Sequence, residues 1–175
     1  HGASGKHLSE GERSMIALFK ESAVTLMHQT EGVLVPFNIF YNALHKFIDL
    51  THSTVITKAG ENQNLNDFDA ELLKVLFMIK YVKEIKSNVD NLTTLIIGNI
   101  DDDRIALKKQ VEGSLKRLIK QTLVQKNGEV YIFLTNEEQD INRSIAQENV
   151  EMGEIINEAS TVIFEDIFTE KKYRY

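Results

Sequence analysis

The chain has 175 residues, of which 42% are hydrophobic and 26% are charged, and its formal net charge is −6. This composition is that of a folded protein with a core of its own, which excludes wholesale disorder, and the negative charge argues weakly against nucleic-acid binding. The sequence contains no cysteine, which excludes disulfides and thiolate metal sites and suits a reducing cytoplasm.

Residues 1–64 contain two predicted helices. The run "LSEGERS" has the spacing of a capping box, and apolar residues then recur at helical intervals as far as Met27. Pro36 starts a second segment, whose apolar stripe extends to Ile48. The polar, turn-rich run at 60–67 favours a domain boundary, so we expect a helical N-terminal segment over 1–64.

Helical patterns fill the middle of the chain. Three predicted helices cover 67–85, 88–100 and 101–122. The first is apolar around much of its circumference, which predicts a buried central helix. We expect Asp90 or Asn91 near the cap of the second helix. We expect Asp101–Asp103 at the N-terminus of the third, where carboxylates bind free amides and complement the helix dipole.

A β-hairpin is predicted directly after the third helix, over 122–135. Its two strands flank Asn127-Gly128, and Asn-Gly favours a type I′ turn with positive φ at both central residues. A short extra strand near 86–89 is expected to pair with the hairpin. Three helices and a hairpin, in that order, are typical of a winged helix, which is a helix-turn-helix variant. We therefore predict a mainly α fold, with a winged-helix domain over 65–136 and flanking helical segments.

The charges are distributed unevenly along the chain. When Lys and Arg are counted against Asp and Glu, residues 104–126 carry seven positive and one negative side chain, a net of +6. Residues 137–170 carry one positive and ten negative side chains, a net of −9. The second block predicts an acidic C-terminal helix and tail over 137–175. The first block favours a basic surface, which the total charge conceals.

The predicted third helix divides into an apolar arc and a cationic ridge, at about 100° per residue. The arc consists of Leu107, Val111, Leu115, Leu118 and Thr122. The candidate DNA-binding residues are Lys109, Lys116 and Lys120 opposite the arc, Arg117 at the edge of the ridge, and Lys126 at the tip of the hairpin. Such a helix can lie along phosphates. No Asn or Gln lies at the centre of the ridge to read adenine, so we expect contacts with the backbone of duplex DNA.

No enzyme is expected. The run "GASGK" lacks the glycine spacing of a phosphate-binding loop and has His7 where Ser or Thr would bind magnesium. The run "LSEGER" faintly resembles the signature helix of ABC-type ATPases, but a helix cap accounts for it better. His45 and His52 could share a helix face, with no third metal ligand near them in the sequence. We therefore predict no catalytic, cofactor-binding or metal-binding residue.

Several stretches together resemble one protein family: "LSEGERSMIALFKESA", "VPFNIFYNALHKFID", "LLKVLFMIKYVKEI", "DDDRIALKKQVEGSLKRLIKQTLVQKNGEVYIFLTNEEQDINR" and "FEDIFTEKKYRY". They are similar to the large P-loop ATPase component of the bacteriophage exclusion (BREX) defence systems, the BrxC/PglY type, from about Leu8 to Tyr175. Those proteins are much longer, so the resemblance implies an internal fragment, without the nucleotide motifs, of a parent protein that binds ATP. It also implies a role in bacterial phage defence, in complexes associated with DNA.

Two functions stay open at this point. The first is a non-catalytic winged-helix module that contacts DNA. The second is a protein-interaction or oligomerisation module whose basic face binds an acidic partner, such as another BREX component or the acidic C-terminal helix of the same or a neighbouring chain. No apolar run is long enough to cross a bilayer, and the start of the sequence lacks the apolar core of a signal peptide. We therefore expect a cytoplasmic protein without a membrane partner.

Overall fold

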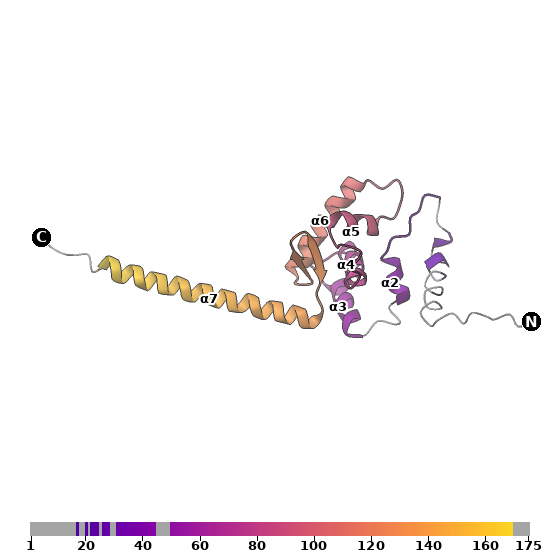
Figure 1. Cartoon of the computed structure of the whole chain (residues 1–175). Helices are drawn as coiled ribbons and strands as arrows, with labels where there is room; N and C mark the ends of the chain where they lie inside the picture. The colour runs from indigo at the N-terminus through magenta and orange to yellow at the C-terminus, as the bar shows by residue number, and fades with distance from the viewer. Residues whose placement is uncertain are drawn as a thin grey trace, which may run out of the picture. The chain divides into compact units, whose positions relative to one another are not determined.

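The computed structural model describes residues 31–44 and 50–169, together with scattered positions between 17 and 28. The chain divides into two compact units, residues 1–136 and 137–175. The described residues are mainly helical and contain one two-stranded antiparallel sheet (Figure 1). This confirms the prediction of a mainly α fold with a β-hairpin. Most of the helix predicted before Met27 lies outside the described residues.

The elements follow one another as α2, α3, α4, α5, α6, β1, β2 and α7 (Figure 1). Their bounds are Ile39–Leu44, Leu50–Glu61, Asp67–Ile79, Val89–Ile96, Arg104–Lys120, Val124–Asn127, Val130–Phe133 and Asn136–Thr169. The long acidic helix α7 was predicted. None of the described helices combines the length and the apolar character that a membrane-spanning helix requires.

Helix α3 lies in the N-terminal segment that was expected to be helical, but no separate helix was predicted at these residues. Its run "LTHSTVIT" is rich in Thr, Val and Ile, which lose side-chain freedom in a helix and therefore give a weak helical signal. Val55, Ile56 and Ala59 are nevertheless buried in the core. Packing of this face stabilises the helix where the intrinsic propensity is low.

Helix α4 ends at Ile79, six residues earlier than predicted. Beyond it the backbone forms tight turns, in which Val82 N–H donates to the Ile79 carbonyl at 3.0 Å. The chain then passes alongside the hairpin, where Tyr131 N–H donates to the Ser87 carbonyl at 3.0 Å. The extra strand predicted near 86–89 is thus reduced to this one backbone hydrogen bond to β2, and no strand is assigned there.

The caps of the three central helices are formed by side chains. Asn66 and Asp69 form a reciprocal capping box at the start of α4, with both side chain to backbone distances at 3.0 Å. Asn88 caps α5 and accepts from Asn91 N–H at 2.9 Å, so the cap expected at Asp90 or Asn91 lies two or three residues earlier. Asp103 caps α6, as predicted.

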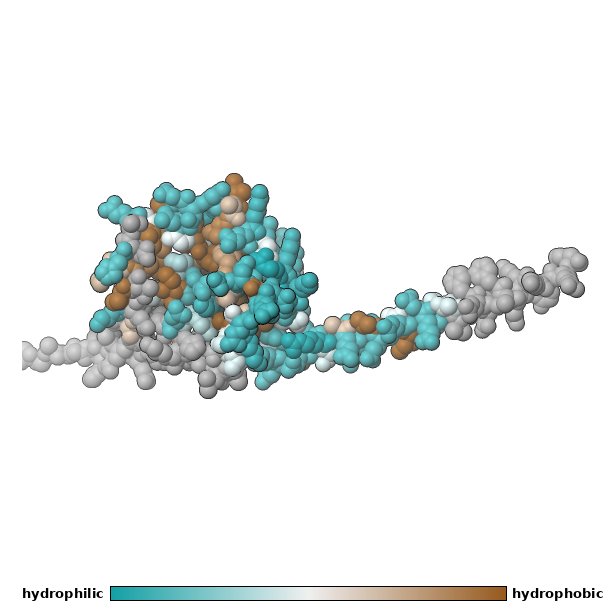
Figure 2. Space-filling view, turned by 180° about the vertical axis from the view of Figure 1, so that it is seen from behind, coloured by the Kyte–Doolittle hydropathy of each residue, from teal (hydrophilic) through white to brown (hydrophobic). Residues whose placement is uncertain are grey.

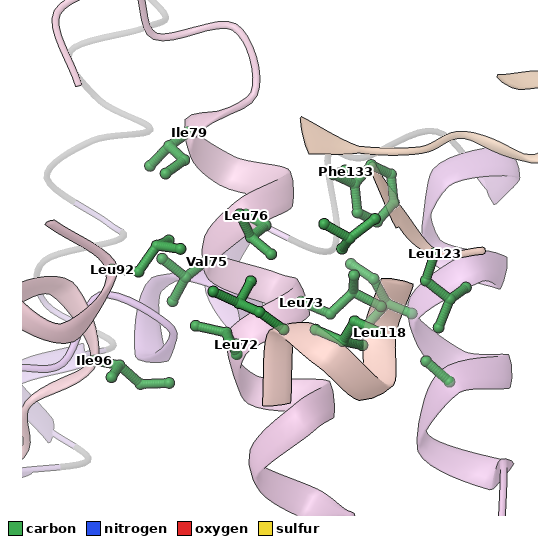
Figure 3. Close-up of a cluster of buried hydrophobic side chains, with 14 of the residues drawn as sticks. Leu72, Leu73, Val75, Leu76, Ile79, Leu92, Ile96, Leu118, Leu123 and Phe133 are labelled. Carbon is green, nitrogen blue, oxygen red and sulfur yellow. The ribbon is translucent and has the colours of Figure 1, made fainter. Parts of the chain in front are cut away.

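The hydrophobic core is centred on α4. Leu72, Leu73 and Val75 are fully buried, which confirms the predicted central helix. Figure 3 shows these residues between side chains of α5, α6 and the hairpin, including Leu92, Leu118 and Phe133. The same core includes Tyr41 and Val55 from residues 1–64. The predicted division into segments 1–64, 65–136 and 137–175 stays a prediction.

The hairpin closes one residue later than predicted. Asn127 pairs with Val130, so the two-residue loop is Gly128-Glu129. Gly128 has φ +59°, whereas neither Asn127 nor Glu129 has positive φ. A positive φ at the first central residue alone is the pattern of a type II′ turn, so the predicted type I′ turn is wrong.

Strand β1 begins at Val124, two residues later than predicted, because α6 ends in a turn. Thr122 N–H donates to the Ile119 carbonyl at 2.9 Å, and Leu123 N–H donates to the Leu118 carbonyl at 3.0 Å. This is a Schellman motif, in which Thr122 occupies the position that favours glycine and adopts φ +60°. Thr122 is therefore a turn residue, and neither its predicted place in the apolar arc nor the start of β1 at 122 is correct.

Candidate nucleic-acid interface

Helix α6 carries an exposed row of lysines opposite its buried face. Its buried residues are Val111, Ser114, Leu115 and Leu118, which fits the predicted arc. Lys109, Lys116 and Lys120 are exposed, and we call these three residues the lysine ridge. None of them forms an ion pair with another residue that the structure describes. Their charges can therefore meet an external anion.

Arg117 is positioned differently from the lysine ridge. Its Nε donates to Asp69 Oδ2 at 2.8 Å and its Nη2 donates to Asp69 Oδ1 at 2.7 Å. The Arg117 side chain is 39% exposed, whereas Asp69 is completely buried. The sequence pattern placed Arg117 at the edge of the ridge and gave no sign of this partner. The guanidinium links α6 to the first turn of α4, so the main role of Arg117 is structural.

The surroundings of Asp69 stabilise its charged form. Burial raises the pKa of the Asp69 carboxyl, but the hydrogen bonds from Arg117 and the Asn66 backbone, together with the charge of Arg117, lower it below its ordinary value. The nearby Ser114 hydroxyl is buried and makes no hydrogen bond to a described residue. The same ion pair raises the pKa of Arg117.

Lys126 lies on strand β1 of the hairpin, where it pairs with Tyr131. Its Nζ is 5.8 Å from the centroid of the Tyr131 ring. It lines a hollow of about 290 Å³ between the start of α5, α6 and the hairpin. The other charged residues of this hollow are Asp90, Lys108, Glu112 and Glu129. No lysine of the ridge lines it, so the structure does not bring all five candidate residues together.

Lys108 and Asp90 form an ion pair in this hollow, at 2.7 Å. The hydrogen bond and the charge of Lys108 lower the pKa of Asp90, and Asp90 correspondingly raises the pKa of Lys108. Lys108 contributed to the net charge of +6 along the sequence. Like Arg117, Lys108 is a cation of α6 that already forms an ion pair with a carboxylate of the same chain.

Acidic and apolar residues flank the lysine ridge. Asp101–Asp103 are exposed at the N-terminus of α6, and Glu112 is exposed between Lys109 and Lys116 in the sequence. Ile105 and Ile119 are 71% and 37% exposed on the same helix. Figure 2 likewise shows hydrophilic and hydrophobic residues interspersed over the visible face of the first unit. The ridge is thus a narrow cationic row within a mixed surface.

A second basic cluster was not predicted from the sequence. Lys80, Lys83 and Lys86 line a hollow of about 210 Å³ whose apolar wall includes Val130 and Ile132. Lys80 Nζ also lies 5.6 Å from the centroid of the Tyr81 ring. The regular spacing of three residues between these lysines was visible in the sequence, but the predicted helix through residue 85 concealed the loop that carries them.

Among the described residues, no group of three or more His, Cys, Asp or Glu side chains could hold a metal ion. The chain matches no protein-family model and no solved structure. A function is therefore inferred from the geometry of the described residues and from the resemblance noted in the sequence.

Proposed function

We propose that residues 65–136 form a non-catalytic winged-helix module that contacts the phosphate backbone of duplex DNA through the lysine ridge. The order α4, α5, α6 and hairpin is that of a winged helix. The hydrogen bond from Tyr131 N–H to the Ser87 carbonyl supports this assignment, because it places the segment between α4 and α5 beside β2, where a winged helix has its first strand.

The exposed lysine ridge is the observation that carries the DNA proposal. Lys109 and Lys120 are eleven residues apart on one helix, which corresponds to roughly 16 Å at 1.5 Å per residue. Successive phosphates of one DNA strand are about 3.4 Å apart along the helix axis, so the row can run beside several of them. Lys126 adds a fourth cation only if the DNA also reaches the hairpin.

The acidic N-terminus of α6 restricts the mode of contact. In helix-turn-helix proteins the N-terminal residues of the recognition helix contact base edges in the major groove. Asp101–Asp103 would bring carboxylates close to phosphates in that orientation. The proposed contact is therefore with the backbone, along the middle and the C-terminal half of α6, and without base reading.

The resemblance extends this proposal to the parent protein. We propose that the chain is a piece of a BREX-type ATPase of bacterial phage defence, in which ATP binds elsewhere and other BREX components are partners in the cytoplasm. The module would then hold DNA near the ATPase core. The support for this is the set of similar sequence stretches, above all "FLTNEEQDINR".

A second function is favoured by a specific observation, the exposure of Ile105 and Ile119 beside the lysines. A mixed apolar and basic helix face also suits an acidic protein surface.

Fluorescence anisotropy of a labelled duplex separates the two functions. It is measured with the full chain and with a variant that replaces all three ridge lysines by glutamine. Salt-sensitive binding that the variant loses supports DNA contact, whereas wild-type protein without any such binding supports protein docking.

A further inference from the structure

Helix α7 exposes an apolar stripe. Its described side chains include six exposed large hydrophobic residues, and at about 100° per residue five of them fall within an arc of about 100°. These five form the α7 stripe and are between 51% and 65% exposed: Ile141, Ile145, Met152, Ile155 and Ile156. The sixth, Val150, is 60% exposed on the opposite side. Hydrophobic residues stand among hydrophilic ones along α7 in Figure 2.

The spacing of the stripe is self-complementary. Ile141 and Ile156 are equally far in sequence from a midpoint between Glu148 and Asn149, and so are Ile145 and Met152. Two antiparallel copies of α7 centred on this midpoint therefore place isoleucine opposite isoleucine, and Ile145 opposite Met152. Such a pairing is isologous, because each helix offers the same surface to the other across a twofold axis.

We propose that α7 binds α7 of a second copy of this chain in antiparallel orientation, through the α7 stripe. Ile145 and Met152 are seven residues apart, and Ile155 and Ile156 lie three and four residues beyond Met152. Helices that pack along a common seam use this spacing. The proposal is independent of DNA binding by the lysine ridge.

The area of the stripe suffices for a weak dimer. Burying an Ile or Met side chain completely removes roughly 60–120 Å² from water, at the usual ratio of apolar area to transfer free energy. Ten side chains that are each more than half exposed then lose on the order of 300–700 Å² of apolar area. With the accompanying polar area the interface buries roughly 500–1,200 Å², which is the range of weak contacts and at its upper end reaches the lower limit for a specific one. We expect a dissociation constant in the micromolar range.

The carboxylates of α7 make the dimer sensitive to salt. Asp140, Glu151, Glu154 and Glu158 fall about 100–160° from the centre of the stripe, so they stay in solvent when the stripe is buried. Glu137 and Glu138 fall at the edges of the arc, and Glu148 falls within it, beside the proposed twofold axis. Two helices of this charge repel each other. Since salt screens exposed charges, self-association should strengthen as the salt concentration rises, which is opposite to the behaviour of a DNA contact.

Sedimentation velocity of the full chain over a wide range of concentration tests the proposal. The expected result is a monomer–dimer equilibrium that tightens with salt. Ile145→Gln should weaken it by roughly tenfold or more, because the symmetric dimer loses the aliphatic contact of Ile145 in both chains. Val150→Gln is the matched control and should leave it unchanged. A chain that is monomeric at all concentrations, or equal effects of the two variants, would overturn the proposal.

The orientation is tested by cysteine cross-linking, because the natural chain contains no cysteine. A mixture of Ile145→Cys and Met152→Cys chains should form an intermolecular disulfide, since these positions are opposite each other in the antiparallel register. Each variant alone should cross-link poorly. Efficient cross-linking within the Ile145→Cys variant alone indicates parallel helices and contradicts the proposed pairing.

Discussion

The guanidinium of Arg117 binds the carboxylate of Asp69 through two hydrogen bonds, at 2.8 and 2.7 Å. Asp69 is completely buried and also closes the capping box of α4 with Asn66. One carboxylate therefore satisfies the start of α4 and fixes the C-terminal half of α6 against it. The lysine ridge lies on the same helix, so its orientation depends on this ion pair.

Arg117→Ala should destabilise the protein by about 3 kcal/mol, because it leaves the Asp69 charge buried without its partner. Arg117→Lys should recover only part of this loss, since a lysine ammonium cannot form both parallel hydrogen bonds. Denaturant unfolding followed by circular dichroism measures the change in the free energy of unfolding.

The matched control for this prediction is Lys116→Ala, the neighbouring exposed lysine of the ridge. It should change the free energy of unfolding by less than about 0.5 kcal/mol, as exposed substitutions usually do. If Arg117→Ala is as mild as Lys116→Ala, the ion pair contributes nothing to stability. A charge reversal at Arg117 is consequently no test of DNA contact, because it would also leave the buried Asp69 charge without its partner.

The Arg117–Asp69 pair also predicts a pH dependence. The pKa of Asp69 is lower in the folded protein than in the unfolded chain, where it is about 3.9. Its contribution to stability is therefore complete above about pH 5 and is lost as pH falls through the folded pKa. The difference in unfolding free energy between wild type and Asp69→Asn should be constant from about pH 5 to 7 and shrink below about pH 4. A difference that stays constant down to pH 2 would exclude the lowered pKa.

The sequence predicted the helices and their exposed faces better than the ion pairs between side chains of different helices. The helical periodicity of α6 placed Lys109, Lys116 and Lys120 correctly opposite the buried face, because this periodicity is a local property. The partner of Arg117 lies 48 residues away in the sequence, so no local pattern could identify it. The pairing of Lys108 with Asp90, 18 residues away, was missed for the same reason.

Backbone conformation set a second limit on the sequence prediction. Thr122 is β-branched and usually avoids positive φ, so it favoured a strand, whereas the fold requires a turn residue there. The core of α4 was predicted because a helix that is apolar around most of its circumference is stable in water only when other elements bury it.

Thr122→Gly should stabilise the protein by about 1 kcal/mol. The φ of +60° is strained for a β-branched residue, and glycine adopts it without a Cβ clash. Part of the gain is offset by the greater freedom of glycine in the unfolded chain. Thermal or chemical unfolding measures the effect, and a clear loss of stability would show that contacts of the Thr122 side chain outweigh its backbone strain.

At the hairpin loop, Gly128→Ala should have the opposite effect and destabilise the protein. A Cβ at this position meets no atom within 4 Å, so any loss of stability comes from the backbone conformation alone. The φ of +59° at the first position of a type II′ turn should make alanine unfavourable by about 1–3 kcal/mol. Gly60→Ala is the matched control, because its Cβ would also meet open space but its helical φ is ordinary. It should be neutral or stabilising. Equal effects of the two variants would mean that the loop conformation is not strained.

The lysine ridge predicts how DNA affinity depends on salt. Each neutralised phosphate contributes about −0.9 to the slope of log K against log salt. Three ridge lysines therefore limit the slope to about −2.7, or about −3.6 with Lys126, compared with about −4.5 for the five cations proposed from the sequence.

Lys116→Gln should reduce the steepness of the slope by about 0.9, whereas Lys58→Gln, which replaces an exposed lysine on α3, should leave it unchanged. Fluorescence anisotropy titrations of a duplex at several salt concentrations give the slopes. Equal slopes for the two variants, or a wild-type chain that does not bind DNA, would favour an acidic protein as the partner of the ridge.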